Sequence, residues 1–445
     1  MADLNAASSS GTVQLRRALR LRDLILYGII IIQPTAPMPV FGIVSQTARG
    51  HVVTAVLIAM VAMLFTAVSY GRMARILPSA GSAYSYVSHA LHPGFGYLAG
   101  WSVALDYMLN PVICTIWCSK AAQNFFPYLP FWLLAVFFAG LFTLLNLRGI
   151  ETSARINFGM ALGMGVIVLL FLFYAGLYIA HQHLTTAALL LPFYDPASFN
   201  FSRLGSGVAI AVLTYIGFDS VSTLGEEVEN PRRNILLATV LVCVITGALA
   251  AIEVYAAQLV WPDYAKYPDV DTAFVHIAGR AGGAWLFAVM NFTLLVATVG
   301  SGFTAQLAAA RLLLGMGRDN AIPRRFFGAV DQRTRIPRNN VLFCGAVALA
   351  AGLSISYTQG AELLNFGAFM AFMGVNAAAF WEYCVRQGQR SWQSWVPPVL
   401  GFVVCFYIWL HLSSVAKIAG SSWLVLGAFY GWRRGVFRKR SPKPA

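Results

Sequence analysis

Three acidic residues lie inside long apolar stretches of this sequence, where ionisable side chains are rare and functional by default. Asp106 lies in "GWSVALDYMLNP", Asp219 in "IGFDS" and Glu253 in "AIEVYAAQLV". A carboxyl group in such surroundings can carry a proton, or it can stay ionised when a cationic group pairs with it. We therefore take Asp219 as a candidate partner for an ammonium group, and Asp106 and Glu253 as candidate proton carriers. The structural alternatives are a helix cap for Asp219, a hydrogen-bonding role for Asp106 and a buried pair for Glu253.

Two of the apolar stretches carry signals that break a helix. In "IIIIQPTAPMPVFGIVS" three prolines, Pro34, Pro37 and Pro39, fall within six positions. Each proline removes a backbone hydrogen bond and clashes with the preceding turn, so the cluster predicts non-helical backbone over residues 35–41, whereas one proline would predict only a kink. In "AVLTYIGFDSVSTLGEEVENP" Gly217 interrupts the run shortly before Asp219.

Broken helices bring backbone chemistry into a membrane. Freed N–H groups attract a carboxylate, and freed carbonyls attract an ammonium group or another cation. The candidate substrate-binding residues therefore come from both breaks: Thr35, Ala36, Met38 and Phe41 from the first, and Tyr215, Gly217, Phe218 and Asp219 from the second. Tyr215 and Phe218 flank the second break and could close over an amine through cation–π contacts; ordinary packing between helices is the alternative.

The elements that position these residues are membrane-spanning helices. The chain has 445 residues, 58% of them hydrophobic and 11% charged, with a mean hydropathy of +0.67, which excludes an ordinary soluble domain. Apolar stretches long enough to span a bilayer recur along the whole sequence. We expect twelve spans, over residues 24–45, 53–70, 94–119, 131–147, 156–180, 206–224, 234–260, 284–314, 340–357, 361–384, 396–413 and 421–436.

The net charge of +14 could indicate nucleic-acid binding, but the placement of the basic residues argues against it. With the N-terminus in the cytoplasm, most of the 31 Lys and Arg residues fall in cytoplasmic loops. This asymmetry is typical of an inner-membrane protein and puts both termini in the cytoplasm.

The sequence lacks the marks of an enzyme or an ATP-driven pump. It shows no phosphate-binding loop, no metal-ligand spacing and no nucleophile–base arrangement, so we expect no cofactor and no metal. Two broken helices about five spans apart indicate a secondary transporter built from inverted repeats, with its substrate at mid-membrane. The alternatives from other classes are a channel, which would show a recurring polar stripe along a pore, and a receptor, which would carry a soluble signalling domain.

Six stretches, in this order and spacing, carry a family resemblance. They are "FGIVS", "SYGRMARILPSAGSAYSYV", "GWSVALDY", "YIGFDSVSTLGEEVENPRRNI", "RLLLGMGRDNAIP" and "LLNFGAFMAF". The chain resembles the amino acid–polyamine–organocation (APC) superfamily of permeases along nearly its whole length, and within it the bacterial putrescine importers. Asp219 matches an acidic position of those importers. Where they carry an aspartate before "FGIVS" this chain has Pro39, and Gln46 replaces their following glycine.

The resemblance implies an all-α fold of the leucine-transporter type. Helices 1–5 and 6–10 would form two inverted repeats, helices 1 and 6 would be broken, and two further helices would follow. The expected segments are a cytoplasmic N-terminal segment (1–22), the first repeat (23–195), the second repeat (196–390), helices 11 and 12 (391–436) and a basic cytoplasmic tail (437–445).

The resemblance also implies a function. The chain would import a small organic amine or amino acid across the inner membrane, with putrescine or another polyamine favoured, by proton symport and alternating access. A neutral amino acid permease, or an exchanger of amines or amino acids, is the alternative. The expected partners are the substrate, protons as coupling ion and the lipid bilayer, with no nucleic acid.

Overall fold

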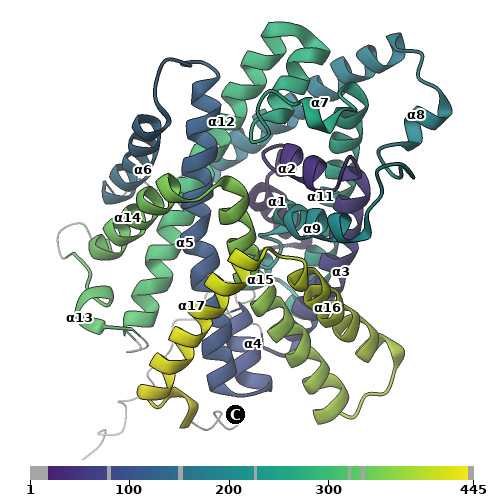
Figure 1. The fold of residues 1–445 in the computed structure, drawn as a ribbon. Coiled ribbons are helices and arrows are strands. Elements are labelled where there is room, and N and C mark those ends of the chain that lie inside the picture. The colour runs from purple at the N-terminus through teal and green to yellow at the C-terminus, as the bar shows by residue number, and fades with distance from the viewer. Residues whose placement is uncertain are drawn as a thin grey trace, which may run out of the picture.

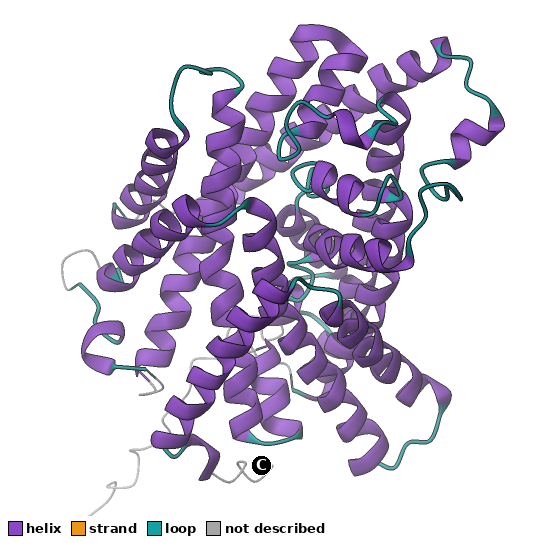
Figure 2. Cartoon of the chain, viewed as in Figure 1, coloured by secondary structure: helices purple, strands orange, loops and turns teal. Residues whose placement is uncertain are grey.

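The chain folds into a bundle of helices (Figure 1). The structure, a computed structural model, describes residues 19–77, 82–148, 154–224, 228–318, 322–331 and 336–438, and these ranges contain no β-strand (Figure 2). The α-helices are α1 (Leu21–Ile32), α2 (Phe41–Thr47), α3 (Val52–Ile76), α4 (Ser82–Ala90), α5 (Pro93–Gln123), α6 (Phe131–Leu147), α7 (Ala154–His181), α8 (Thr186–Leu190), α9 (Phe201–Ala211), α10 (Ser220–Thr223), α11 (Pro231–Val260), α12 (Ala273–Arg318), α13 (Arg324–Phe327), α14 (Arg338–Ser354), α15 (Tyr357–Phe380), α16 (Trp392–Leu410) and α17 (Ser414–Arg433). Shorter 3-10 or π segments are η1 (Val212–Tyr215), η2 (Tyr264–Lys266), η3 (Trp381–Arg386) and η4 (Val436–Arg438). The expected all-α fold is confirmed.

Many of these helices suit a membrane. Within the described ranges, seven helical segments are long and apolar enough to cross a bilayer, and α6 is apolar but shorter. The seven are Val52–Ile76, Gly159–His181, Phe201–Ser222, Pro231–Val260, Ala273–Arg318, Tyr357–Arg386 and Trp392–Leu410. The chain is therefore a multi-pass membrane protein, while the count of twelve spans and the inverted repeat stay predictions.

The first helix is broken, as its prolines predict. Helix α1 ends at Ile32, residues 33–40 form turns, and α2 begins at Phe41. Pro34 has no N–H, so the carbonyl of Ile30 loses the donor that would continue the helix. The predicted break over 35–41 is confirmed for 35–40 and wrong for Phe41, because the helix resumes as soon as Pro39, the last proline of the cluster, has passed.

The second break follows α9 and η1. Residues 216–219 form turns before the short helix α10. Gly217 has φ 117°, a left-handed conformation that side chains rarely adopt. A Cβ at Gly217 would lie 2.9 Å from Cγ2 of Ile31, at the end of α1. The two breaks therefore meet at close range, and Gly217 makes this approach possible.

Small residues bring the surrounding helices together. Helix α3 packs along α11, and α5 packs against both α12 and α15. A Cβ at Gly71 of α3 would lie 2.6 Å from Cα of Leu236 in α11, and one at Gly28 of α1 would lie 2.5 Å from Val242. Close backbone approach of this kind supplies the packing that holds helices together in lipid. The two broken helices are thereby held inside the bundle.

Candidate functional site

A cavity of about 130 Å³ lies between the two breaks. It is lined by parts of α1, the turns that follow α1, α5, η1 and the turn after it, α12 and α15. The lining residues are Ile31, Ile32, Gln33, Thr35, Ala36, Pro39, Val40, Asn110, Ile113, Cys114, Trp117, Leu213, Ile216, Leu294, Thr298, Ser301, Tyr357 and Leu364.

The end of α1 gives this cavity an electrostatic character. Ile31, Ile32 and Gln33 line it where α1 stops, and the N–H of Gln33 bonds back to the carbonyl of Ile29. The last carbonyls of a helix lack intrahelical donors and carry the negative end of its dipole. This wall of the cavity can accept hydrogen bonds from an ammonium group.

The polar side chains of the cavity are neutral. Thr35 donates its hydroxyl to the sulfur of Met164 at 3.3 Å, and the thiol of Cys114 donates to Oδ1 of Asn110 at 3.3 Å. Thr298 and Ser301 of α12 also line the cavity. No charged side chain is among the described residues that line the cavity.

The predicted residues of the first break divide into two groups. Thr35 and Ala36 line the cavity. Met38 and Phe41 are each 1% exposed, and the ring of Phe41 packs edge-on against Phe274 with centroids 5.5 Å apart. In this structure Met38 and Phe41 belong to the packed core.

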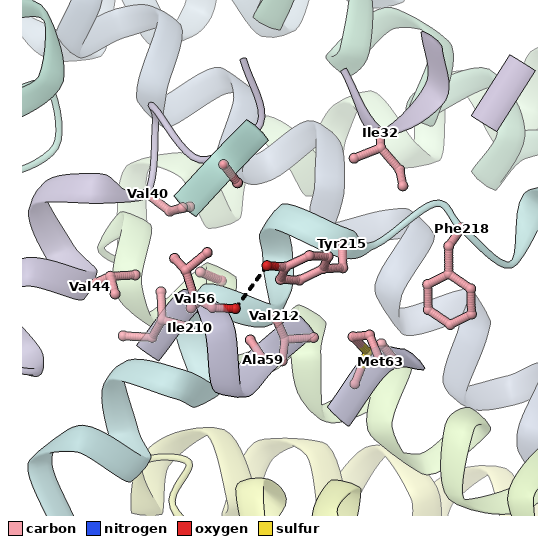
Figure 3. Packing of buried hydrophobic residues seen from close by; sticks show 14 of the residues in the cluster. Ile32, Val40, Val44, Val56, Ala59, Met63, Ile210, Val212, Tyr215 and Phe218 are labelled. Carbon is pink, nitrogen blue, oxygen red and sulfur yellow. Dashed lines mark hydrogen bonds between the residues drawn. The ribbon is translucent and has the colours of Figure 1, made fainter. Parts of the chain in front are cut away.

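The two predicted aromatic residues of the second break are also packed. The hydroxyl of Tyr215 donates to the carbonyl of Val56 at 2.8 Å (Figure 3). Phe218 is fully buried, with its ring 5.6 Å from that of Tyr70 and 5.4 Å from that of Phe372. In this structure both side chains pack against neighbouring helices. Their closure over an amine stays a prediction.

The structure brings Asp219 and Asp106 into one electrostatic environment. Asp219 ends the second break, with the backbone N–H groups of Gly217 and Ser220 near its carboxylate. Asp106, only 8% exposed, lies on α5 close enough for the charges of the two carboxyl groups to interact. Among the described residues, no Lys or Arg forms an ion pair with Asp106 or Asp219. The phenol groups of Tyr70, Tyr86 and Tyr107 also interact electrostatically with the carboxyl group of Asp219.

Glu253 lies elsewhere. Its side chain in α11 is fully buried, and neither carboxyl oxygen has a hydrogen-bond partner among the described residues. Like Asp106 and Asp219, Glu253 does not line the cavity. In the described part of the chain it forms no ion pair. Of the three predicted carboxyl groups, those of Asp106 and Asp219 interact electrostatically, and that of Glu253 does not take part in this interaction.

Other lining residues were not predicted from the sequence. Asn110 precedes Pro111 inside α5, and this "NP" pair within an apolar stretch was an available signal. Thr298 and Ser301 belong to the polar run "TVGS", another available signal. Trp117 and Tyr357 carry no such signal, because aromatic residues are common at every depth of a membrane bundle.

Comparisons with known proteins identify the family of this chain. The family model described as "Amino acid permease" matches residues 40–432. The chain is 31% identical over 439 residues to the "Low-affinity putrescine importer PlaP" of Escherichia coli (strain K12), covering 96% of this chain and 95% of that protein. It is 28% identical over 466 residues to the "Branched-chain amino acid permease BcaP" of Lactococcus lactis subsp. cremoris (strain MG1363), covering 95% of this chain and 96% of that protein.

The family match identifies this helical membrane bundle, with its two broken helices beside a small cavity, as a permease. The chain belongs to the amino acid permease family of the APC superfamily. The family resemblance inferred from the six sequence stretches is confirmed.

Proposed function

We propose that this protein imports a small organic amine, with putrescine or a related polyamine as the favoured substrate, by proton symport and alternating access. The observation that carries the proposal is the pair Asp219 and Asp106, which has no basic partner among the described residues. A charge buried without a partner is costly, so a cationic substrate or a proton is the natural complement of such a pair. The likeness to a putrescine importer supports the same substrate class.

The proposed roles follow from position. Asp219 pairs with an ammonium group of the substrate, and the carbonyl end of α1 contributes further acceptors near Thr35 and Ala36. Asp106 or Glu253 carries the coupled proton. Gly217 gives the backbone its turn, and Met38, Phe41, Tyr215 and Phe218 contact the substrate only after a conformational change, since they are packed in this structure.

The proposed architecture is twelve spans, with inverted repeats over 23–195 and 196–390 and two further helices over 391–436. The breaks between α1 and α2 and between α9 and α10 support it, because each lies in the first span of its proposed repeat. The distribution of basic residues supports an inner-membrane protein with both termini in the cytoplasm.

A neutral amino acid is the second candidate substrate. The described lining of the cavity carries no charge, which suits a zwitterion with an apolar side chain, and BcaP is named for branched-chain amino acids. In that case, free N–H groups at the breaks would hold the carboxylate.

Thermal unfolding of the detergent-purified protein with a panel of amines and amino acids tests the substrate. A ligand that binds only the folded state raises its stability by about 2.7 kcal/mol at a hundred times its dissociation constant. We expect putrescine to raise the unfolding midpoint with concentration, and leucine to leave it unchanged. Stabilisation by leucine alone would replace the first candidate with the second, and stabilisation by neither group would contradict both.

Uptake into proteoliposomes separates symport from exchange. Symport predicts that an inward proton gradient drives accumulation of putrescine into vesicles that contain no substrate. Uptake that requires preloaded internal substrate and ignores the gradient would establish exchange instead.

A further inference from the structure

The end of α5 is tied to the loop of residues 267–272, which precedes α12. Trp117 lines the cavity and is 1% exposed. Its indole N–H donates a hydrogen bond to the backbone carbonyl of Asp271 at 2.9 Å. One turn later on α5, Nζ of Lys120 lies 3.4 Å from Oδ2 of Asp269. The other oxygen of Asp269 accepts the backbone N–H of Asp271 at 2.8 Å. The carboxylate of Asp269 therefore contacts both Lys120 and Asp271, the residue whose carbonyl accepts the hydrogen bond from Trp117.

The same loop also contacts the first broken helix. The hydroxyl of Tyr267 lies 3.1 Å from Oγ of Ser45 in α2, and its ring centroid lies 6.0 Å from that of Phe41. Gly42 of α2 approaches the carbonyl of Val270 so closely that a side chain there would collide with it. The loop therefore bridges α2, which follows the first break, and α5, which forms a wall of the cavity.

Helix α5 is also held by hydrogen bonds to α12. The amide of Asn291, fully buried in α12, donates to the carbonyl of Ala121 at 2.8 Å and accepts from the side-chain amide of Asn124 at 3.2 Å. The Lys120–Asp269 pair has no such burial, since the two side chains are 34% and 32% exposed. A partly exposed ion pair adds little to the stability of a fold. Such a contact can break and re-form while α5 stays in place.

We propose that Lys120 and Asp269 are positioning residues for transport: their ion pair holds the loop of residues 267–272 against Trp117 and keeps the cavity closed at this end of the bundle. Under the proposed topology this end faces the outside of the cell. The inference rests on the proposed function for its meaning, because closing the cavity regulates access only if the cavity receives substrate. The contact itself can be tested without any substrate.

Cys114 provides the readout. Its thiol is free, it lines the cavity, and it lies one turn before Trp117 on α5. A hydrophilic thiol reagent reaches Cys114 only when the cavity opens, so the labelling rate reports closure directly. Peptide mass spectrometry assigns the label to Cys114, and Cys118, which is fully buried, serves as an internal comparison.

The experiment compares variants of the full-length protein in detergent. We expect Lys120→Met to raise the labelling rate of Cys114 by about two- to fivefold, the equilibrium factor of a partly exposed ion pair, and Lys120→Arg to restore the slow rate. Asp269→Asn keeps an oxygen for the N–H of Asp271 but loses the charge, and it should match Lys120→Met. Lys266→Met is the matched control, because the Lys266–Asp263 pair at 2.8 Å joins the last residue of η2 to the residue just before it and does not reach a second helix.

Two results would overturn the proposal: an unchanged rate in both Lys120→Met and Asp269→Asn, or an equal rise in Lys266→Met. If the variants label faster but the wild-type protein transports no amine, the closure by this ion pair stands and the proposed function fails. Labelling of intact cells and of inside-out vesicles with an impermeant reagent then assigns the side. Faster labelling of the variants from outside supports an outer closure, and faster labelling only from the cytoplasmic side contradicts its placement.

Discussion

Glu253 is a buried residue whose surroundings do not supply what a carboxyl group requires. Both of its oxygens are shielded from solvent and have no hydrogen-bond partner in the described part of the chain. A protein retains such a group against a cost in stability, because buried polar groups without partners are unfavourable. That cost is consistent with a functional role such as carrying a proton.

Replacing Glu253 with an apolar residue of similar size should therefore stabilise the protein. We expect Glu253→Met to raise the free energy of unfolding by about 1–3 kcal/mol, the penalty of one unsatisfied buried polar group. The midpoint of thermal unfolding in detergent measures the change. Glu253→Gln, which keeps a buried polar group, is the control and should recover little. A Met variant less stable than the wild type would show that the carboxyl group has a stabilising partner.

Individual site residues were predictable from the sequence where their chemistry was unusual for a membrane. Asp106 and Asp219 stood out as charges in apolar stretches, and in the structure the charges of the two carboxyl groups interact. Trp117 could not be predicted, because its place in the cavity wall depends on a hydrogen bond to Asp271, 154 residues away in sequence. Contacts of that range depend on how the helices pack.

At the scale of elements, Gly217 lets the second broken helix pack closely against the end of α1. We expect Gly217→Ala to destabilise the protein by about 1–3 kcal/mol, because the side chain would be strained at φ 117° and would press on Ile31. Gly140→Ala in α6 is the matched control: nothing lies within 4 Å of a Cβ there, and alanine is the better helix former. Thermal unfolding measures both variants. Equal midpoints for the two would mean that the second break does not require a glycine.

The loop of residues 267–272 should respond to pH through Asp271. Burial raises the pKa of this carboxyl group above its ordinary value of 3.8, the nearby charge of Asp269 raises the pKa further, and Lys120 opposes both effects. The phenol of Tyr357 also interacts electrostatically with Asp271. A raised pKa means that the closed loop favours the protonated form of Asp271, so the contribution of Asp271 to closure is full below pH 3.8 and is lost as the pH rises through the raised pKa.

Asp271→Asn removes this dependence and leaves the backbone contacts of the residue intact. We expect the variant to label at Cys114 more slowly than the wild type at neutral pH, with the two rates converging toward pH 4. Expressing the result as a ratio of rates at each pH cancels the intrinsic pH dependence of thiol chemistry. A ratio that does not change with pH would exclude Asp271 from the closure.

The first break was predictable from sequence because prolines act locally. Pro34 removes a donor wherever the helix lies, and the observed turns begin within one residue of it. The end of that break was misplaced at Phe41, since no local signal marks where a helix resumes after Pro39. The tie between α5 and the loop after η2 was not predicted at all, since surface-like charges such as Lys120 and Asp269 are common in loops.

At the scale of the whole molecule, the distribution of basic residues makes a testable prediction about orientation. We expect a fluorescent protein fused after Arg434 to fold and fluoresce, and alkaline phosphatase fused at the same point to be inactive, because both fusions would lie in the cytoplasm. A phosphatase fused within the loop of residues 182–199 should be active. The opposite pattern would invert the proposed topology and put the Lys120–Asp269 closure on the cytoplasmic side.

The fold class and family were predictable from the sequence because hydropathy and proline placement are properties of the chain itself. The substrate was not, because it depends on which polar groups meet around a cavity of about 130 Å³. By the family resemblance, Pro39 stands where the putrescine importers carry an aspartate, so the sequence does not supply a second carboxylate for a diamine at this position. Under the proposed function, Asp106 would be the second carboxylate for a dication, since its charge interacts with that of Asp219.

Uptake of labelled putrescine by proteoliposomes tests the central claim most directly, with wild-type protein compared with Asp219→Asn under an inward proton gradient. Loss of a charge that pairs with a desolvated cation typically costs about 2–5 kcal/mol, so uptake by Asp219→Asn should fall by at least about thirtyfold, to background. Asp263→Asn, which alters an exposed carboxylate in the loop before η2, is the control and should transport normally. Wild-type uptake by correctly folded Asp219→Asn would contradict the account by removing Asp219 from substrate binding.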